Sequence, residues 1–225
     1  MDAMLLMQYT SREQRLAARR SLLDMAAAIP TRGSGSDLRA LMAAPRRYET
    51  WQFEAALRLR EAGVRFAVAG AVGANAYMPP RRTEGLDITV EADAFRSANH
   101  AILGPGTVGL ATPLFYEDMG CIVWGIDGHK VSVVKLPRAW GKQAVAAAQS
   151  NFPAGGMPTL TLPYAVAAKL ISARPQDGAD IARMLGGASD EAVEEVRALV
   201  RAIRPGDADD LDGLIAAGRL EFAGS

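Results

Sequence analysis

The feature of this sequence that most constrains its fold is a pair of apolar, β-branched runs joined by a two-residue turn. The runs cover residues 121–126 and 130–136, and Asp127 and Gly128 lie between them. Asp-Gly favours the tight turns that join antiparallel strands, because the central residues of such turns adopt a left-handed backbone. The sequence therefore predicts a β-hairpin, and with it a sheet that contains an antiparallel pair.

Two more strands are predicted upstream, on either side of a short helix of small residues. Residues 64–70 form an apolar run, and residues 71–77 are expected to be helical. Residues 86–91 alternate strictly, which places Leu86 on one face of a strand and Asp87 on the other. Consecutive strands that include a hairpin indicate an α+β fold with a mixed sheet rather than a doubly wound parallel one.

Helices are predicted before and after this core. The expected helices cover residues 11–28, a segment from about Asp37, residues 51–62 ended by Gly63, residues 93–103 capped by Asp93, a segment from Pro163, residues 176–185, a segment opened by Ser189, and residues 207–220. Residues 31–37 have the composition of a linker. The predicted division is an N-terminal helical segment (1–62), an α/β core (63–150) and a C-terminal helical segment (151–225) that packs on the core.

Charge and cysteine content exclude several classes of protein. The 225 residues include 25 Lys plus Arg and 25 Asp plus Glu, so no bulk basic field favours nucleic acid or acidic membranes. The single cysteine, Cys121, cannot form an internal disulfide. No apolar run reaches the length of a membrane span, and the N-terminal residues lack the pattern of a signal peptide. We therefore expect a cytoplasmic location and no membrane partner.

The most informative motif joins the first two strands. The apolar strand ends at Gly70, Ala71 follows it, and the loop after the short helix carries Arg81 and Thr83 before Asp87. A second motif lies downstream, where a lysine, an arginine and two aspartates follow one another at helical spacing. Its residues are Lys169, Leu170, Arg174, Asp177 and Asp180.

Together the two motifs resemble those of the polymerase-β-like nucleotidyltransferase superfamily, and most closely its minimal and abortive-infection (AbiEii-type) members. The resemblance covers about residues 64–185. It implies a nucleotidyltransferase-like mixed sheet core with N- and C-terminal helical extensions. It also implies transfer of a nucleoside monophosphate from a nucleoside triphosphate, with Mg²⁺ as cofactor, in a toxin–antitoxin setting.

The resemblance also assigns roles to residues. Asp87 is expected to be the catalytic, metal-binding carboxylate, and Gly70 and Ala71 are expected to form the phosphate turn. Substrate contacts are expected from Arg81, Thr83, Lys169 and Arg174, and Asp177 and Asp180 are expected to support the two basic side chains. Magnesium takes oxygen ligands, commonly one or two carboxylates together with substrate phosphates.

The sequence departs from the family pattern at two carboxylate positions. Gly85 stands where the first acid of an acid-apolar-acid segment is expected, and Ser132 stands at the best match for the third acid. Of the other nearby acids, Glu84 lies in a loop, Glu91 is distant along the strand, and Asp127 is explained by the hairpin. We favour loss of the metal site over its rescue by these residues.

Structural explanations compete with each functional one. Asp87 is equally well explained as a polar residue on a solvated strand face. Arg81 fits an exposed loop, and the downstream motif fits a charge network between helices better than direct contact with substrate.

Three functions are therefore open. The chain is a nucleotidyltransferase with an unknown acceptor, a degenerate member that acts as a binding or regulatory module, or an interaction protein that forms a homo-oligomer through its N-terminal helices.

Overall fold

The computed structural model describes residues 49–103, 107–109, 114–116, 118–126, 128–153, 157–172 and 174–223. These residues group into two compact units. The sheet unit comprises the described residues of 49–76 and 80–165, and the helical unit comprises 77–79 and those of 166–223. The predictions for residues 11–28, for the linker at 31–37, for the helix from about Asp37 and for Asp127 lie outside the described residues.

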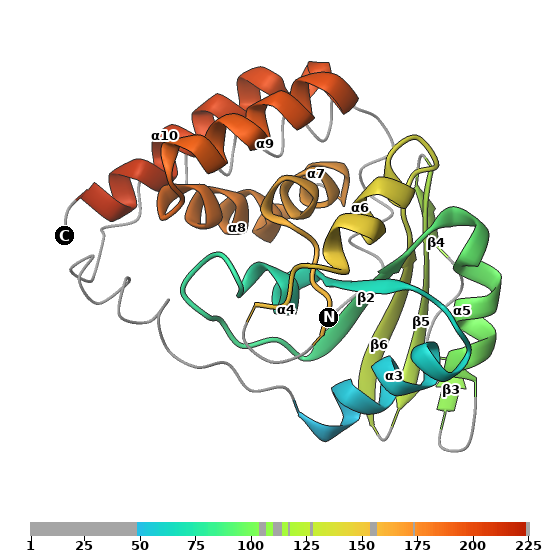
Figure 1. Ribbon diagram of the computed structural model, residues 1–225. Helices are drawn as coiled ribbons and strands as arrows, with labels where there is room; N and C mark the ends of the chain where they lie inside the picture. Colours follow the sequence, from blue (N-terminus) through green and yellow to red (C-terminus); the bar gives the residue numbers. More distant parts are fainter. Residues whose placement is uncertain are drawn as a thin grey trace. The chain divides into compact units, whose positions relative to one another are not determined.

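The sheet unit is built on a mixed sheet, which confirms the predicted α+β class (Figure 1). Within the described residues the sheet has six strands: β1 (Phe66–Ala69), β2 (Gly85–Val90), β3 (Thr107–Gly109), β4 (Leu114–Tyr116), β5 (Met119–Ile126) and β6 (His129–Lys135). The order is β1-β2-β6-β5-β3, and β4 also pairs with β5. The β2–β6 pair is parallel and the other pairs are antiparallel.

The predicted hairpin is confirmed as the β5–β6 pair. Ile126 and His129 are directly opposite each other at the end of this antiparallel pair. Gly128 has a φ of +81°, the left-handed conformation that the Asp-Gly signal anticipates. The strands β3 and β4 and the helix α6 (Gly141–Ala148) were not predicted from the sequence.

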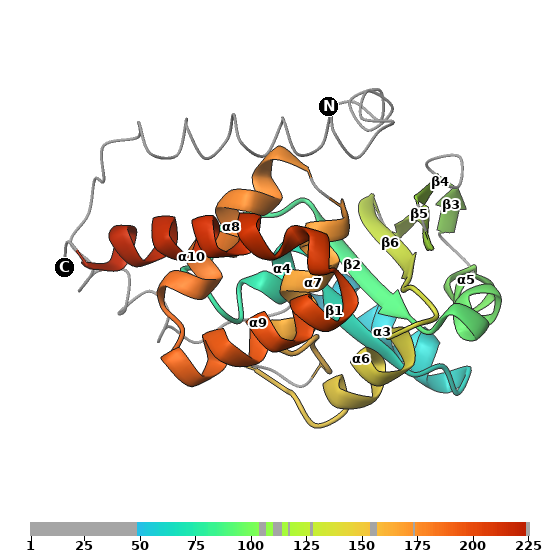
Figure 2. The same ribbon diagram turned by 90° about the horizontal axis from the view of Figure 1, so that it is seen from above.

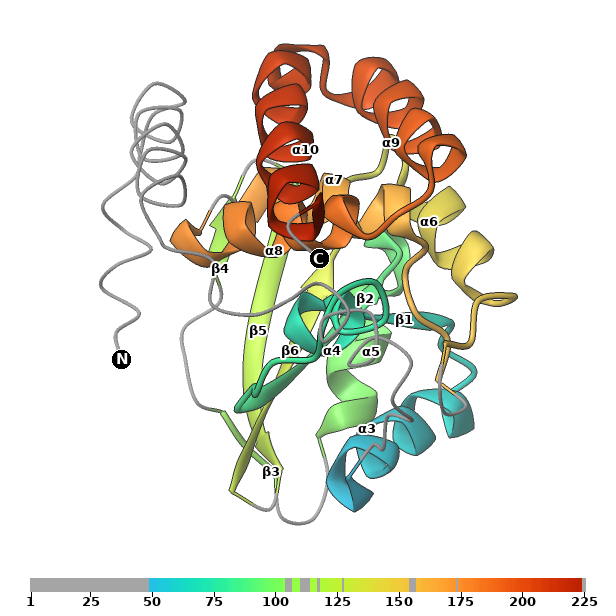
Figure 3. The ribbon, with the colours of Figure 1, turned by 90° about the vertical axis from the view of Figure 1, so that its left-hand side faces the viewer.

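One face of the sheet carries the apolar core of this unit. Leu86, Ile88 and Val90 are fully buried there, as their alternation predicts. Two helices, α3 (Thr50–Glu61) and α5 (Phe95–Ile102), pack against this face (Figure 1; Figure 3). Each fully buried leucine or isoleucine side chain contributes about 2 kcal/mol to folding, so this face anchors the unit.

Both ends of α3 are capped, and the end at Gly63 was predicted from the sequence. The side chains of Glu49 and Gln52 form a reciprocal capping box at its start. Gly63, just past its end, has a φ of +67°, which glycine adopts at little cost. The predicted cap of the next helix is wrong, because Ala94 precedes α5 and Asp93 lies in a short 3₁₀ turn (Ala92–Ala94), where it pairs with Arg138.

The opposite face of the sheet is not uniformly solvated. Thr89 is 1% exposed, and its hydroxyl donates a hydrogen bond to the Ala67 carbonyl at 2.9 Å. The interpretation of this face as solvated is therefore wrong at Thr89. The short helix α4 (Gly70–Ala74) begins on this face. The outer edge of β1 is covered by the segment around Thr159, which forms a parallel bridge with Val68.

The helical unit consists of packed helices (Figure 2). Its elements are α7 (Leu162–Ser172, which begins in the sheet unit), α8 (Pro175–Gly186), α9 (Asp190–Ile203), a 3₁₀ turn (Pro205–Asp207) and α10 (Ala208–Ala223). Ser189 caps α9 as predicted, because its hydroxyl accepts a hydrogen bond from the Ala192 amide at 3.2 Å. Gly186 on α8 and Gly218 on α10 allow these two helices to pack closely. A Cβ on Gly218 would lie 1.9 Å from the Ala182 carbonyl oxygen.

None of the described helices combines the length and the apolar character that crossing a membrane requires.

Candidate functional site

The sheet unit brings Gly70 and Asp87 into direct contact. Ala69 and Asp87 are partners in the antiparallel β1–β2 pair, so the chain turns at Gly70 immediately beside Asp87. Gly70 has a φ of +57°, and a Cβ built on it would lie 1.8 Å from Asp87 Oδ2. Both the backbone conformation and the carboxylate therefore require glycine at this position. The structure thus joins the ends of the first motif, which lie 17 residues apart in the sequence.

The Asp87 carboxylate is half-buried and has no partner within the described part of the chain. It forms no hydrogen bond or ion pair with any residue there. A partly buried carboxylate without a partner is uncommon, because desolvation of the charge is not offset. Such a group is a candidate for contact with a ligand.

Strand β6 places two more side chains on the Asp87 face. Asp87 is paired with Ser132, and Gly85 is paired with Lys130, in the parallel β2–β6 register. Alternate residues of a strand share a face, and paired residues of neighbouring strands point the same way. The row that faces α4 therefore contains Gly85, Asp87, Lys130 and Ser132.

Two side chains, those of Asn75 and Thr83, hold the loop between α4 and β2. Asn75 Nδ2 donates to the Arg81 carbonyl at 2.9 Å, and Asn75 Oδ1 accepts from the Arg81 amide at 3.0 Å. Thr83 donates its hydroxyl to the Gly85 carbonyl at 3.2 Å. Arg81 and Thr83 are thus fixed at the start of β2 through local contacts. Sequence reasoning missed Asn75, although an Asn between a short helix and two prolines is a typical turn residue.

The second motif forms a buried charge network in the helical unit. Lys169 on α7 is 5% exposed, and its Nζ lies 2.8 Å from Asp177 Oδ1 and 2.7 Å from Asp180 Oδ2. Both aspartates are on α8 and are also buried. The charge network that helical spacing predicts is therefore present.

Asp177 has further partners at the start of α8. Its Oδ2 accepts hydrogen bonds from the Arg174 amide at 3.2 Å, from Arg174 Nε at 3.0 Å and from the Ser172 hydroxyl. Burial by itself raises the pKa of this carboxyl. The charges of Lys169 and Arg174, with their hydrogen bonds, outweigh burial and hold the pKa of Asp177 well below its ordinary range.

The predicted site residues thus fall into two sets, each ordered within its own unit. Gly70, Ala71, Arg81, Thr83 and Asp87 belong to the sheet unit. Lys169, Arg174, Asp177 and Asp180 belong to the helical unit. A groove shared by both sets stays a prediction of the resemblance.

The donor set of the sheet unit fits a pair of magnesium ions poorly. Asp87 is the one carboxylate in its row, Gly85 has no side chain, and Ser132 offers a neutral hydroxyl. Glu91 is paired with Arg65 at 2.7 Å. Across the described ranges, no group of three or more His, Cys, Asp or Glu side chains is arranged to hold a metal ion.

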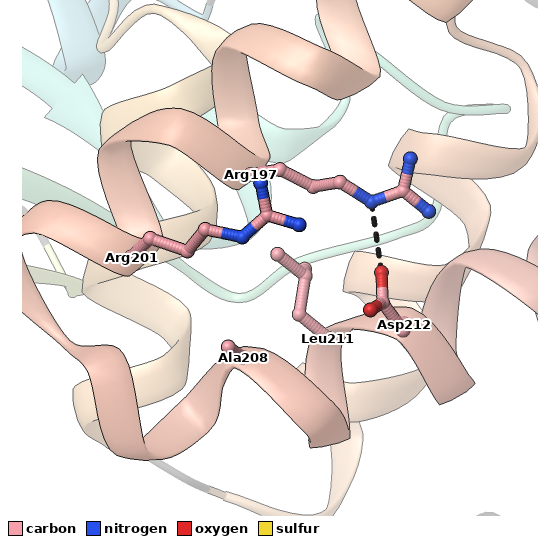
Figure 4. A pocket seen from close by; sticks show the side chains of 5 residues that line it. All are labelled: Arg197, Arg201, Ala208, Leu211 and Asp212. Carbon is pink, nitrogen blue, oxygen red and sulfur yellow. Dashed lines mark hydrogen bonds and ion pairs between the residues drawn. The ribbon is translucent and has the colours of Figure 1, made fainter.

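A shallow hollow lies between α9 and α10 in the helical unit (Figure 4). It has a volume of about 150 Å³, and Arg197, Arg201, Ala208, Leu211 and Asp212 line it. Arg197 Nε donates to Asp212 Oδ1 at 2.8 Å, and the guanidinium also pairs with Glu194. Its charge is therefore satisfied within the protein, and we assign no ligand to this hollow.

No protein-family model and no curated protein matches the chain.

Proposed function

We propose that this chain is a nucleotidyltransferase-fold protein that binds a nucleoside triphosphate in its sheet unit and acts as a binding or regulatory module. The observation that carries the proposal is the contact between Gly70 and the Asp87 carboxylate. It unites a glycine turn after an apolar strand with an acid on the adjacent strand, and this pair is what the resemblance predicts.

The turn supports phosphate binding through its lack of a side chain. Gly70 and Ala71 present a backbone that a phosphate group can approach closely, since nothing larger than a methyl group projects from either residue. Asn75 fixes the backbone at Arg81 on the other side of α4, which orders the loop that leads to Asp87. Substrate contacts by Lys169 and Arg174 remain part of the proposal and rest on the resemblance alone.

The composition of the Asp87 row supports binding without transfer. Two divalent ions carry four positive charges, and a single carboxylate leaves most of this charge uncompensated by the protein. A chain that retains the turn but not the acids retains the means to hold a nucleotide, while it lacks the means to activate an attacking hydroxyl.

Transfer of a nucleoside monophosphate to an acceptor is the second candidate. The unpartnered state of the Asp87 carboxylate favours it, because a metal-binding acid stays free of protein cations. A test is to replace Gly85 and Ser132 by aspartate. Mg²⁺ affinity that appears only in the double variant supports the binding module, whereas tight Mg²⁺ binding by the native chain supports the transferase.

The binding proposal is tested by titrating the full chain with a fluorescent, non-hydrolysable ATP analogue. We expect saturable binding that Gly70→Ala abolishes, because the overlap of the new methyl group with Asp87 Oδ2 shifts the backbone of the turn that holds the phosphates. Gly63→Ala is the matched control, since Gly63 also has a positive φ but has no atom within 4 Å of the added Cβ. Absence of binding by the native chain would contradict the proposal.

A further inference from the structure

We propose that the ammonium group of Lys130, rather than a magnesium ion, neutralises the phosphates bound beside Asp87. The inference rests on the proposed function and names how that site recognises its ligand. With Lys130 as the cation, the site would bind nucleoside triphosphates that carry no magnesium ion.

The need for a cation follows from Asp87 itself. Phosphates placed against the Gly70 turn lie next to an unpartnered carboxylate, and two anionic groups at short distance repel each other. A cation must lie between or beside them for binding to be favourable. The carboxylates that would hold a metal cation are absent from this row, since Gly85 and Ser132 occupy the other two positions.

The register of β2 and β6 places a lysine where the first of these carboxylates is missing. Gly85 and Lys130 are partners in the parallel pair. A Cβ built on Gly85 would lie 3.2 Å from Lys130 Cβ and 3.1 Å from the Lys130 carbonyl oxygen. The lysine side chain therefore leaves the sheet on the face that carries Asp87, beside the space that an aspartate at position 85 would take.

The Lys130 side chain is long enough to place its ammonium group beside Asp87, and no described residue holds that group elsewhere. Positions two residues apart on a parallel strand are separated by about 6.6 Å, and neighbouring strands by about 4.8 Å. A flexible four-carbon stem with three donors on its ammonium group can cover the region between Gly85 and Asp87. Lys130 is exposed, and its ammonium group forms no hydrogen bond or ion pair with any described residue.

A lysine at this place also opposes metal binding. A divalent ion beside Asp87 would lie close to the ammonium group, and like charges at such distances disfavour each other. Lysine by contrast is a common phosphate ligand that acts as a point charge. The glycine at position 85 and the lysine paired with it therefore both disfavour a metal ion beside Asp87.

The test is a titration of the full chain with the fluorescent ATP analogue, once in excess EDTA and once in excess Mg²⁺. We expect binding in EDTA that is at least as tight as in Mg²⁺. We expect Lys130→Ala to weaken binding in EDTA by about tenfold or more, the usual loss for a charge-assisted contact, and Lys130→Arg to retain most of it. Lys135→Ala is the matched control, because Lys135 lies five residues later on the same strand and therefore faces the other side.

The outcomes separate the inference from the proposed function. Binding that requires Mg²⁺ would overturn the inference and leave the proposed function standing. Binding in EDTA that Lys130→Ala does not weaken would overturn the role of Lys130 alone. Absence of binding under both conditions would overturn the proposed function, and the inference with it.

Discussion

Two of the acidic positions that the sequence motifs single out, Asp87 and Asp177, are held in opposite ways. Asp87 is half-buried on a glycine turn and has no partner among the described residues. Asp177 is buried and is paired with Lys169, Arg174 and Ser172. A carboxylate whose hydrogen bonds are complete within the protein stabilises the fold, and one that is left open is available to a ligand. The comparison therefore separates a motif whose charges are paired within the protein from one whose carboxylate is free to contact a ligand.

The largest expected effect is on the Asp177 side. Lys169→Met keeps the apolar stem but leaves two buried aspartates without their shared cation, so we expect a loss of about 3–5 kcal/mol in the free energy of unfolding. Urea unfolding followed by far-UV circular dichroism measures it. Arg183→Ala, which breaks the partly exposed Arg183–Glu221 pair, is the control and is expected to cost less than about 1 kcal/mol.

The three tryptophans allow unfolding of the sheet unit to be followed separately from the loss of helix. Trp51, Trp124 and Trp140 all belong to the sheet unit, so tryptophan fluorescence reports on that unit alone. A Lys169→Met variant as stable as the control would show that the network contributes nothing to the fold, and the contrast with Asp87 would disappear.

The next effect is expected at Gly70. Gly70→Ala introduces a positive-φ strain and a steric overlap with Asp87 Oδ2, which together cost about 2–4 kcal/mol. Combining it with Asp87→Ala should recover part of this cost, because the clashing oxygen is removed. Unfolding free energies of the two single variants and the double variant measure the coupling. Strict additivity of the single effects would contradict the contact.

A smaller effect is expected from pH. The pKa of Asp177 is depressed in the folded protein from its ordinary 3.8, so the unfolded chain takes up the proton first as pH falls. The stability that this group contributes is thus complete above about pH 4 and is lost as pH falls through the folded pKa. Urea unfolding at pH 6, 4 and 3 should show this loss, and Asp177→Asn should show a flatter dependence. An identical pH profile for both proteins would rule out Asp177 as its source.

The smallest effect on stability is expected at Asp87. Asp87→Asn breaks no described hydrogen bond or ion pair, so the free energy of unfolding should change by less than about 0.5 kcal/mol. Thermal unfolding compared with the native chain measures it. A loss above 2 kcal/mol would mean that Asp87 is structural, like Asp177.

Local chemistry made part of this structure predictable. The β5–β6 hairpin, the end of α3 at Gly63 and the cap of α9 at Ser189 each depend on a few neighbouring residues with strong conformational preferences. The strands β3 and β4 have three residues each, and α6 is an alanine-rich helix without a side-chain cap, so none of them carries such a signal.

Only the residues of the candidate site that belong to the two sequence motifs were predictable. The resemblance placed Gly70 and Asp87 in one site, but it did not predict the β1–β2 register that brings them into contact. The position of Lys130 was not predictable, because it depends on the parallel register of two strands whose paired residues are 45 apart in the sequence, with α5 and three other strands between them. The wrong cap at Asp93 shows the converse, since a strong capping residue was used for an ion pair with Arg138 instead.

The most direct test of the account is the affinity of Asp87→Asn for the ATP analogue in EDTA. If Lys130 provides the cation, removal of the negative charge at position 87 relieves repulsion, and the variant should bind the triphosphate as tightly as the native chain or more tightly. If the native chain binds only with Mg²⁺ and the variant loses that binding, Asp87 is a metal ligand and the account is contradicted.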